Sequence, residues 1–387
     1  MSSILQTVFR NAGSLGCTDS RIALMARCGS GDLGHHRRTC DTCAEEDWIP
    51  NACRCRACPF CRAREIAEWV RTTEAELPKV PYFHLVFTTP GELRVIARAF
   101  PAMFNNTLMD AVRESILDIC GDPRHLGATP LMFAVLHTWN QRMHLHPHVH
   151  VVISAGGLTP EGAWKWPGGN RQQGFLVPHR ILRARFQTLL IKKLLANYDS
   201  GDYPDLAKRW TSQSAFKHFL LELRKKSWSL HMKRPLNGPA AIVRYLARYV
   251  NRIAISDSRV IGYDGENVTF TWQDRANGNR TLHEVISAKE FVERFRQHLP
   301  PKRFIRIRFW GLLAHRKRQD ALKQIAQALE VAPPVPDSLP AITRQAPETS
   351  ESHGIRKGPP CKKCETGTML FSGFHLRQSQ MIAHLNN

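Results

Sequence analysis

The sequence predicts an α+β fold in which helices pack on a central antiparallel sheet, preceded by a small zinc-binding domain. Two observations lead to this prediction. Segments typical of buried strands and an amphipathic helix follow one another in the order strand, helix, strand, strand between residues 82 and 154. Before them, eight of the eleven cysteines lie between Cys17 and Cys61, in a stretch too polar to fold around an apolar core.

The individual elements follow from apolar periodicity and from prolines that end helices. A helix is predicted at 63–76, ended by Pro78 and Pro81. Buried strands are predicted at 82–88, 131–136 and 149–154, with a helix at 100–119. The remaining predictions are helices at 181–195, 214–226, from 237 onward, 288–298 and 322–329, and strands at 268–272 and 305–309, the last with the basic and apolar alternation of an edge strand.

The chain is long and strongly basic. Its 387 residues, 43% of them hydrophobic, suffice for a sizeable core and for two or three domains. Lys and Arg exceed Asp and Glu by 54 − 33 = 21, which indicates a polyanionic partner, with nucleic acid the first candidate. No apolar run reaches the roughly 18 residues of a spanning helix, and the N-terminus has no signal-peptide pattern, so we expect a cytoplasmic protein without a membrane partner.

These elements predict four segments. They are a zinc-binding domain with its following helix at 1–76, a catalytic domain at 77–330, a flexible linker rich in Pro, Ser and Thr at 331–360, and a C-terminal tail at 361–387. The tail begins with a Cys-x-x-Cys pair, Cys361 and Cys364. This pair resembles half of a zinc knuckle, but no second pair lies near it in the sequence, so it receives no site assignment.

His148 and His150 form a His-x-His pair in a segment otherwise typical of a buried central strand. Alternate residues of a strand face the same way, so the two imidazoles can hold a divalent cation on a rigid support. Two histidines are an incomplete ligand shell. The candidates for a third ligand are Gln141 and His146.

Two Cys-x-x-Cys pairs have the spacing of a structural zinc site. Cys40 and Cys43 precede Cys58 and Cys61 by about 15 residues, the spacing expected when two turns close around one tetrahedral Zn²⁺. The segment also offers alternative ligands, enough for a second ion: Cys28, His36, Cys53 and Cys55.

Tyr245 and Tyr249 are spaced so that both hydroxyls leave the same side of a predicted helix. A phenol has a pKa of about 10 and is a poor nucleophile near neutral pH, so it needs an activated target. A divalent metal held by the histidine pair would polarise a scissile phosphate. The arginines expected to contact DNA are Arg244, Arg248 and Arg252 beside the tyrosines, and Arg54 and Arg56 beside the cysteines.

Together these motifs resemble the HUH transposases of bacterial rolling-circle insertion sequences, specifically insertion-sequence family ninety-one. The matching segments are Cys28 with His36, Cys40–Cys43, Cys53–Cys61, His84–Thr88, Leu136–Trp139, His146–His150, Tyr245–Tyr249, Arg252–Ser256 and Trp310–Ala314. One departure is that Ala57 stands where these proteins usually carry a histidine before Cys-Pro, while Cys55 is an extra thiol. The zinc ligand set therefore stays open.

The resemblance implies an HUH endonuclease-like fold and an enzyme that cuts and rejoins single-stranded DNA. One tyrosine would attack a phosphate and form a 5′-phosphotyrosine, and the second would take the target strand. Mg²⁺ or Mn²⁺ would serve catalysis at the histidine pair, and Zn²⁺ would be structural. The implied partners are single-stranded DNA at the insertion-sequence ends and at the target site, in a bacterial cytoplasm.

Two other functions stay open at this point. A replication initiator or relaxase-type nicking enzyme would share the histidine pair and the tyrosine, but it is not expected to carry the N-terminal zinc module. A non-catalytic zinc-dependent DNA-binding protein would use the same histidines and tyrosines for packing alone, as most isolated motifs of these kinds do.

Overall fold

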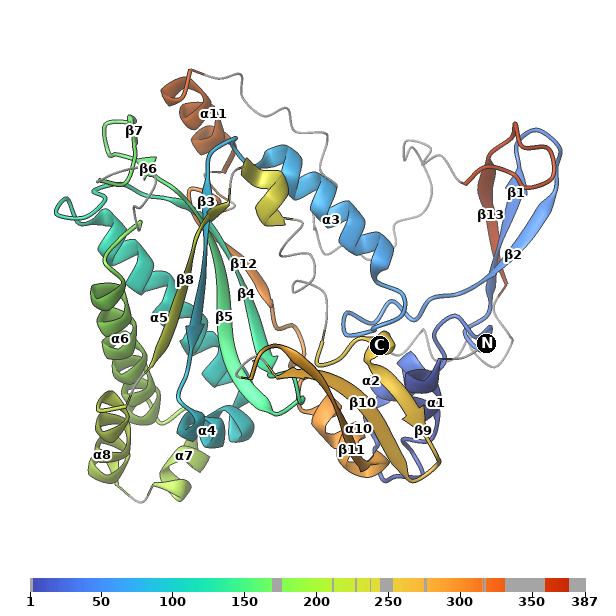
Figure 1. The fold of residues 1–387 in the computed structure, drawn as a ribbon, viewed down its shortest axis with the longest axis horizontal. Helices are drawn as coiled ribbons and strands as arrows, with labels where there is room; N and C mark the ends of the chain where they lie inside the picture. The colour runs from blue at the N-terminus through green and yellow to red at the C-terminus, as the bar shows by residue number, and fades with distance from the viewer. Residues whose placement is uncertain are drawn as a thin grey trace. The chain divides into compact units, whose positions relative to one another are not determined.

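The computed structural model describes residues 3–168, 176–210, 212–226, 228–236, 238–243, 253–274, 277–314, 316, 318–330 and 359–375. The chain divides into two compact units (Figure 1). We call Met1–Glu65, Ile255–Arg296 and Ser338–Asn387 the cysteine-rich unit, and Ile66–Ala254 with Gln297–Asp337 the five-stranded unit. This division departs from the predicted boundaries, because residues 255–296 and the C-terminal tail group with the N-terminal segment.

An antiparallel sheet with the strand order β12-β4-β5-β3-β8 organises the five-stranded unit. The strands are β3 (Tyr82–Thr88), β4 (Leu131–Trp139), β5 (Leu145–Ser154), β8 (Ser229–Leu236) and β12 (Ile307–Gly311). The predicted antiparallel sheet with packed helices is therefore confirmed, with the histidine pair on the central strand and β12 at an edge. The sequence analysis missed β8, where Lys233, Arg234 and Pro235 obscure the strand pattern; proline is tolerated there because β8 is the other edge strand.

The two faces of this sheet carry different helices. Leu85, Phe87 and Val151 belong to the larger apolar core, which one face shares with α4 (Arg94–Ala99), α5 (Pro101–Gly121), α6 (His179–Asp199) and α8 (Gln213–Arg224). Phe133 and Val135 belong to a second core, which includes residues of α3 (Ala63–Glu76), α11 (Arg318–Ala328) and the helical segment 238–243. The smaller elements of the unit are η1 (Gly91–Leu93), β6 (Gly157–Leu158), β7 (Trp164–Lys165) and α7 (Pro204–Arg209).

The cysteine-rich unit contains two small antiparallel sheets, of strand order β13-β1-β2 and β11-β10-β9. Its helices pack through aromatic side chains, with the rings of Phe9 and Phe295 only 4.8 Å apart. Its elements are α1 (Ile4–Arg10), α2 (Ser20–Ala26), β1 (His35–Cys40), β2 (Glu46–Pro50), η2 (Asp257–Arg259), β9 (Val260–Tyr263), β10 (Asn267–Asp274), β11 (Arg280–Ser287), α10 (Ala288–Arg296) and β13 (Met369–His375). Among the described residues of either unit, no helix combines the length and the apolar character that crossing a membrane requires.

Gly311 gives a test of how the edge strand is anchored. It ends β12 with φ +58°, and a Cβ there would collide with the carbonyl oxygen of Pro130. We expect Gly311→Ala to lower the free energy of unfolding by about 1–2 kcal/mol for the left-handed backbone and by a further ~1–3 kcal/mol for the collision. Gly162 has φ +85° but open space around it, so Gly162→Ala should show only the loss that comes from the left-handed backbone. Urea denaturation of both variants measures this difference, and equal losses would contradict it.

Candidate functional site

Three histidines meet on one face of the five-stranded sheet. The register of β4 against β5 pairs His137 directly with His148, and His150 lies two residues further along β5 on the same face. The ligand atoms of the three side chains all lie within 4.8 Å of one another. The rings of His137 and His150 are only 4.5 Å apart between centroids. The arrangement can hold one metal ion.

Hydrogen bonds orient both histidines of the pair. The Nδ1 of His148 lies 2.7 Å from the carbonyl oxygen of His146 and must donate to it, so His148 would coordinate through Nε2. The Nδ1 of His150 shares a hydrogen bond of 2.9 Å with the Nε2 of His84 on β3. The two rings are parallel, with an interplanar angle of 1°. His148 and His150 are therefore each held through Nδ1, and the Nε2 of each would face the ion.

His84, the hydrogen-bond partner of His150, is held in its neutral form by its surroundings. His84 is only 2% exposed. Burial, followed by the positive charge of Lys233, lowers the pKa of His84 to about 3. His137 is also buried and stacks on the ring of Trp139 at 4.5 Å. A neutral imidazole can coordinate a cation, whereas an imidazolium cannot.

A buried histidine from outside the sheet supports the turn between β4 and β5. His298 donates from Nε2 to the carbonyl oxygen of Met143 and accepts at Nδ1 from the hydroxyl of Thr138. Burial lowers the pKa of His298 to about 4, so the ring is neutral and able to accept and donate at once. Both partners belong to the β4–β5 hairpin that carries the three clustered histidines.

The third member of the cluster, His137, is not one of the ligands predicted from the sequence. Gln141 lies in the turn between β4 and β5, and His146 lies on β5 with its ring 5.3 Å from that of His148. His146 does not belong to the group of three. His137 directly follows the apolar run 131–136 that the sequence analysis predicted as a strand, and in the structure it lies within β4. Its position was visible in the sequence, but its pairing with His148 was not.

Tyr245 and Tyr249, with Arg244, Arg248 and Arg252, lie outside the described residues. The structure does describe residues 238–243, which are helical. Ile242 and Val243 are fully buried in the core that includes Val135 and Val152. Val135 pairs directly with His150. The chain leading to the tyrosines therefore packs on the face of the sheet that carries the histidine cluster.

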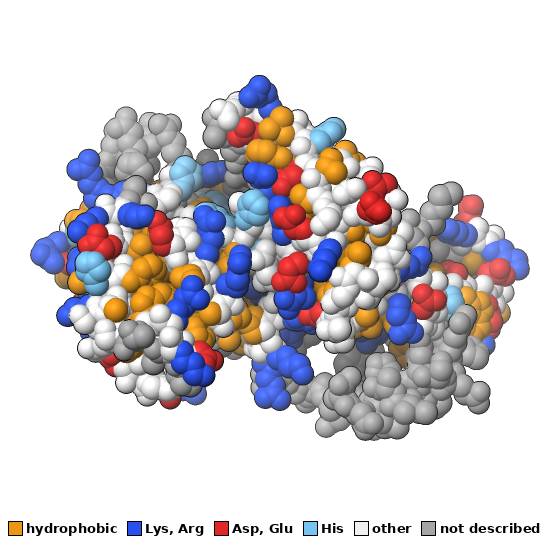
Figure 2. Space-filling view, turned by 90° about the horizontal axis from the view of Figure 1, so that it is seen from below, with side chains coloured by type: hydrophobic (Ala, Val, Ile, Leu, Met, Phe, Trp, Pro, Cys, Tyr) orange, Lys and Arg blue, Asp and Glu red, His pale blue; other side chains and the backbone are white. Residues whose placement is uncertain are grey.

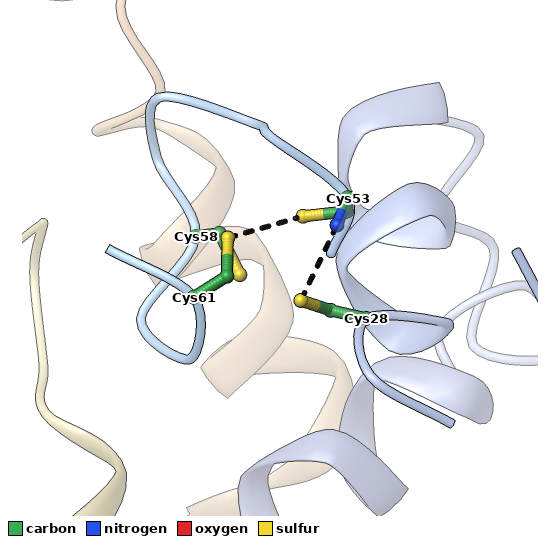
Figure 3. Close-up of side chains that lie close together, drawn as sticks. All are labelled: Cys28, Cys53, Cys58 and Cys61. Carbon is green, nitrogen blue, oxygen red and sulfur yellow. Dashed lines mark hydrogen bonds between the residues drawn. The ribbon is translucent and has the colours of Figure 1, made fainter. Parts of the chain in front are cut away.

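In the cysteine-rich unit, Cys28, Cys53, Cys58 and Cys61 form a four-thiol cluster (Figure 3). Their sulfur atoms all lie within 4.8 Å, and the Sγ atoms of Cys53 and Cys61 are 3.9 Å apart. A tetrahedral zinc with Zn–S bonds of about 2.3 Å places its sulfurs about 3.8 Å apart, so the cluster has the dimensions of a structural zinc site. Four thiols complete the set, so the alanine at position 57 leaves no ligand missing.

The other predicted zinc ligands are distributed differently from the sequence prediction. Cys40 and Cys43 do not join Cys58 and Cys61 around one ion; they form a second cluster with Cys361 and Cys364, again within 4.8 Å. His36 and Cys55 belong to neither cluster. The Nδ1 of His36 instead shares a hydrogen bond of 3.1 Å with the side chain of Asn51.

Arg54 and Arg56, predicted to contact DNA, lie in the loop that runs from Cys53 to Cys58. Both side chains are exposed. Arg54 adopts a positive φ of 52°. The guanidinium groups are therefore available to a ligand at the surface, next to the first thiol cluster.

Comparison with known proteins identifies both parts of the chain. Residues 132–320 match a family model described as "Putative transposase", and residues 6–89 match a model described as "Transposase zinc-binding domain", which is named for IS91. The first match contains the three clustered histidines, and the second contains Cys28, Cys53, Cys58 and Cys61. The cysteine cluster and the second match together support a structural Zn²⁺.

Two relatives align with most of the chain. "Putative transposase y4qJ" of Sinorhizobium fredii is 36% identical over 346 residues, 89% of this chain and 86% of the relative. "Transposase for insertion sequence element IS801" of Pseudomonas savastanoi pv. phaseolicola is 30% identical over 321 residues, 81% of this chain and 75% of the relative. No solved structure matches. The chain belongs to the IS91 family of insertion-sequence transposases.

Proposed function

We propose that this transposase is an HUH-type enzyme that cuts and rejoins single-stranded DNA through a 5′-phosphotyrosine. The observation that carries the proposal is the convergence of His137, His148 and His150 on one face of a buried antiparallel sheet. In this proposal the three histidines hold the catalytic cation, with His137 in the role that the sequence left to Gln141 or His146. His84 would position His150 from the neighbouring strand.

The donor set favours one of the two expected cations. Imidazole nitrogen suits transition ions better than Mg²⁺, so Mn²⁺ fits three histidines better. Three neutral ligands leave the ion its full charge and leave further coordination positions for phosphate oxygens. When bound, the cation would polarise a scissile phosphate and make its phosphorus easier to attack.

The nucleophile in this proposal is Tyr245 or Tyr249. The phenolic oxygen forms a bond to phosphorus while the bond from phosphorus to the 3′ oxygen breaks. The phenol releases its proton to water, and the departing 3′ oxygen takes up a proton from water and becomes a hydroxyl. The phosphotyrosine keeps the ester energy, so a 3′-hydroxyl can attack it and rejoin a strand without nucleotide hydrolysis. The second tyrosine would accept the target strand, and repeated cycles would move the insertion sequence by a rolling-circle-like route.

The charge of the chain suits a single-stranded DNA substrate. Lys and Arg outnumber Asp and Glu by 54 to 33, and basic side chains are plentiful on the face seen in Figure 2. Contacts of this kind to phosphate supply affinity irrespective of sequence. Arg54 and Arg56 near the first thiol cluster, and the arginines beside the tyrosines, are our candidates for such contacts.

The nucleophile assignment predicts that Tyr245→Phe together with Tyr249→Phe abolishes the covalent protein–DNA adduct. Phenylalanine keeps the ring but lacks the oxygen that attacks phosphorus. The assay incubates the protein with single-stranded oligonucleotides from insertion-sequence ends and Mn²⁺, and separates the products on a denaturing gel. Tyr263→Phe, an equivalent change in the cysteine-rich unit, serves as the control and should form the adduct normally. An adduct in the double variant would refute the assignment.

The metal assignment predicts that His137→Ala slows cleavage at least about 100-fold, because a ligand contributes at least as much as its orienting partners. Affinity for single-stranded DNA should stay within about twofold, since phosphate contacts by Lys and Arg provide most of it. His218→Ala on α8, where the histidine is exposed, is the matched control. Cleavage kinetics and fluorescence anisotropy measure the two quantities. A parallel loss of binding and cleavage would argue for a structural role of His137 instead.

A further inference from the structure

The second thiol cluster joins segments from opposite ends of the sequence. Cys40 ends β1 and Cys43 lies in the following turn, whereas Cys361 and Cys364 precede β13. The Sγ atoms of Cys40 and Cys364 are 3.7 Å apart, as are those of Cys43 and Cys361. These separations are far from the roughly 2.05 Å of a disulfide. They match the about 3.8 Å expected between thiolates that share a tetrahedral zinc.

Each Cys-x-x-Cys pair has the local geometry of a metal-binding turn. The backbone N–H groups of Thr42 and Cys43 both donate to the Sγ of Cys40, at 3.4 Å. On the other segment, Lys363 N–H donates to the Sγ of Cys361 at 3.4 Å and Gly367 N–H donates to that of Cys364 at 3.3 Å. Donors of this kind favour a negatively charged sulfur. The turns therefore hold their sulfurs ready to ligate a cation.

Polar contacts hold the two segments in register around the cluster. β13 pairs with β1 from His35 opposite His375 to Cys40 opposite Met369, with one irregularity between Arg37 and Arg38. Next to the thiols, Thr368 N–H donates to a carboxylate oxygen of Asp41 at 2.7 Å, and Lys363 pairs with Glu45 at 2.5 Å. Gly367 approaches so closely that a Cβ there would collide with the Sγ of Cys40.

Apolar burial contributes little to holding β13 in place. The apolar cluster at this position consists of Cys40, Cys361 and Met369, with Cys364 partly buried against it. The large apolar side chains of β13 are on the surface instead, with Phe371 58% and Phe374 61% exposed. So small a core does not compensate for the conformational entropy that the segment loses, and small modules of this kind commonly rely on a metal.

We propose that Cys40, Cys43, Cys361 and Cys364 bind a second structural Zn²⁺, which fastens the C-terminal strand β13 to the N-terminal hairpin of β1 and β2. Half of this site lies far outside residues 6–89, the part that matches the zinc-binding family model. The chain would then carry two zinc ions in separate four-thiolate sites. The second ion would close the polypeptide into a loop by tying residue 40 to residue 364.

Native mass spectrometry of the full chain tests the proposal without any substitution. We expect the mass of the polypeptide plus two zinc ions, and the loss of both under denaturing conditions. Hydrogen exchange should show protection of the β13 amides that falls when a chelator removes both ions. A fully zinc-loaded chain that carries a single ion would overturn the proposal, and so would β13 protection that is unchanged after complete zinc removal.

A pair of variants assigns the second ion to its ligands. Replacing Cys361 and Cys364 together by Ser should halve the zinc content measured by inductively coupled plasma mass spectrometry. The remaining ion at Cys28, Cys53, Cys58 and Cys61 would report that the variant is folded. Cys17→Ser, which removes a thiol outside both clusters, is the matched control and should keep the full zinc content. A double variant that retains both ions would refute the assignment.

Discussion

Antiparallel pairing of β4 with β5 is the constraint on which the histidine cluster depends. The register sets His137 opposite His148, and strand alternation brings His150 to the same face. A shift of one residue would turn His137 toward the opposite core, where Leu136 and Val149 now pack. That core therefore fixes the register, since moving β4 would take Leu136 out of it and place the His137 imidazole among its apolar side chains. His298 adds to the constraint by tying Thr138 to Met143 across the hairpin.

The five-stranded unit and the β13-β1-β2 sheet of the cysteine-rich unit are stabilised by different means. The five-stranded unit buries a large apolar core on one face of its sheet, and this rigid support allows the other face to carry titratable side chains close together. In the β13-β1-β2 sheet, by contrast, the apolar cluster is very small. In this sheet a thiol cluster takes the place of an apolar core, as is common in small polar modules that rely on a bound metal.

The sequence predicted most of the elements because their apolar periodicity is strong. Strand β3 has the predicted bounds of Tyr82–Thr88, and the histidine pair lies on the central strand. The sequence did not predict His137 as part of the cluster, because strand register depends on tertiary packing and leaves no mark in the spacing of residues. The same reason explains why the sequence did not predict which cysteines cluster together. Adjacent pairs suggest a shared ion, but the partners of Cys40 and Cys43 lie more than three hundred residues away.

We propose that His137, His148 and His150 together hold the cation of a DNA-cleaving site. Pulsed electron paramagnetic resonance of Mn²⁺ bound to the zinc-loaded chain tests it most directly, because imidazole nitrogens that coordinate the ion couple to its electron spin. We expect nitrogen couplings from histidine in the wild-type chain and their loss when all three residues are replaced by Ala. Bound Mn²⁺ without such couplings, or couplings that persist in the triple variant, would show that these histidines do not hold the ion.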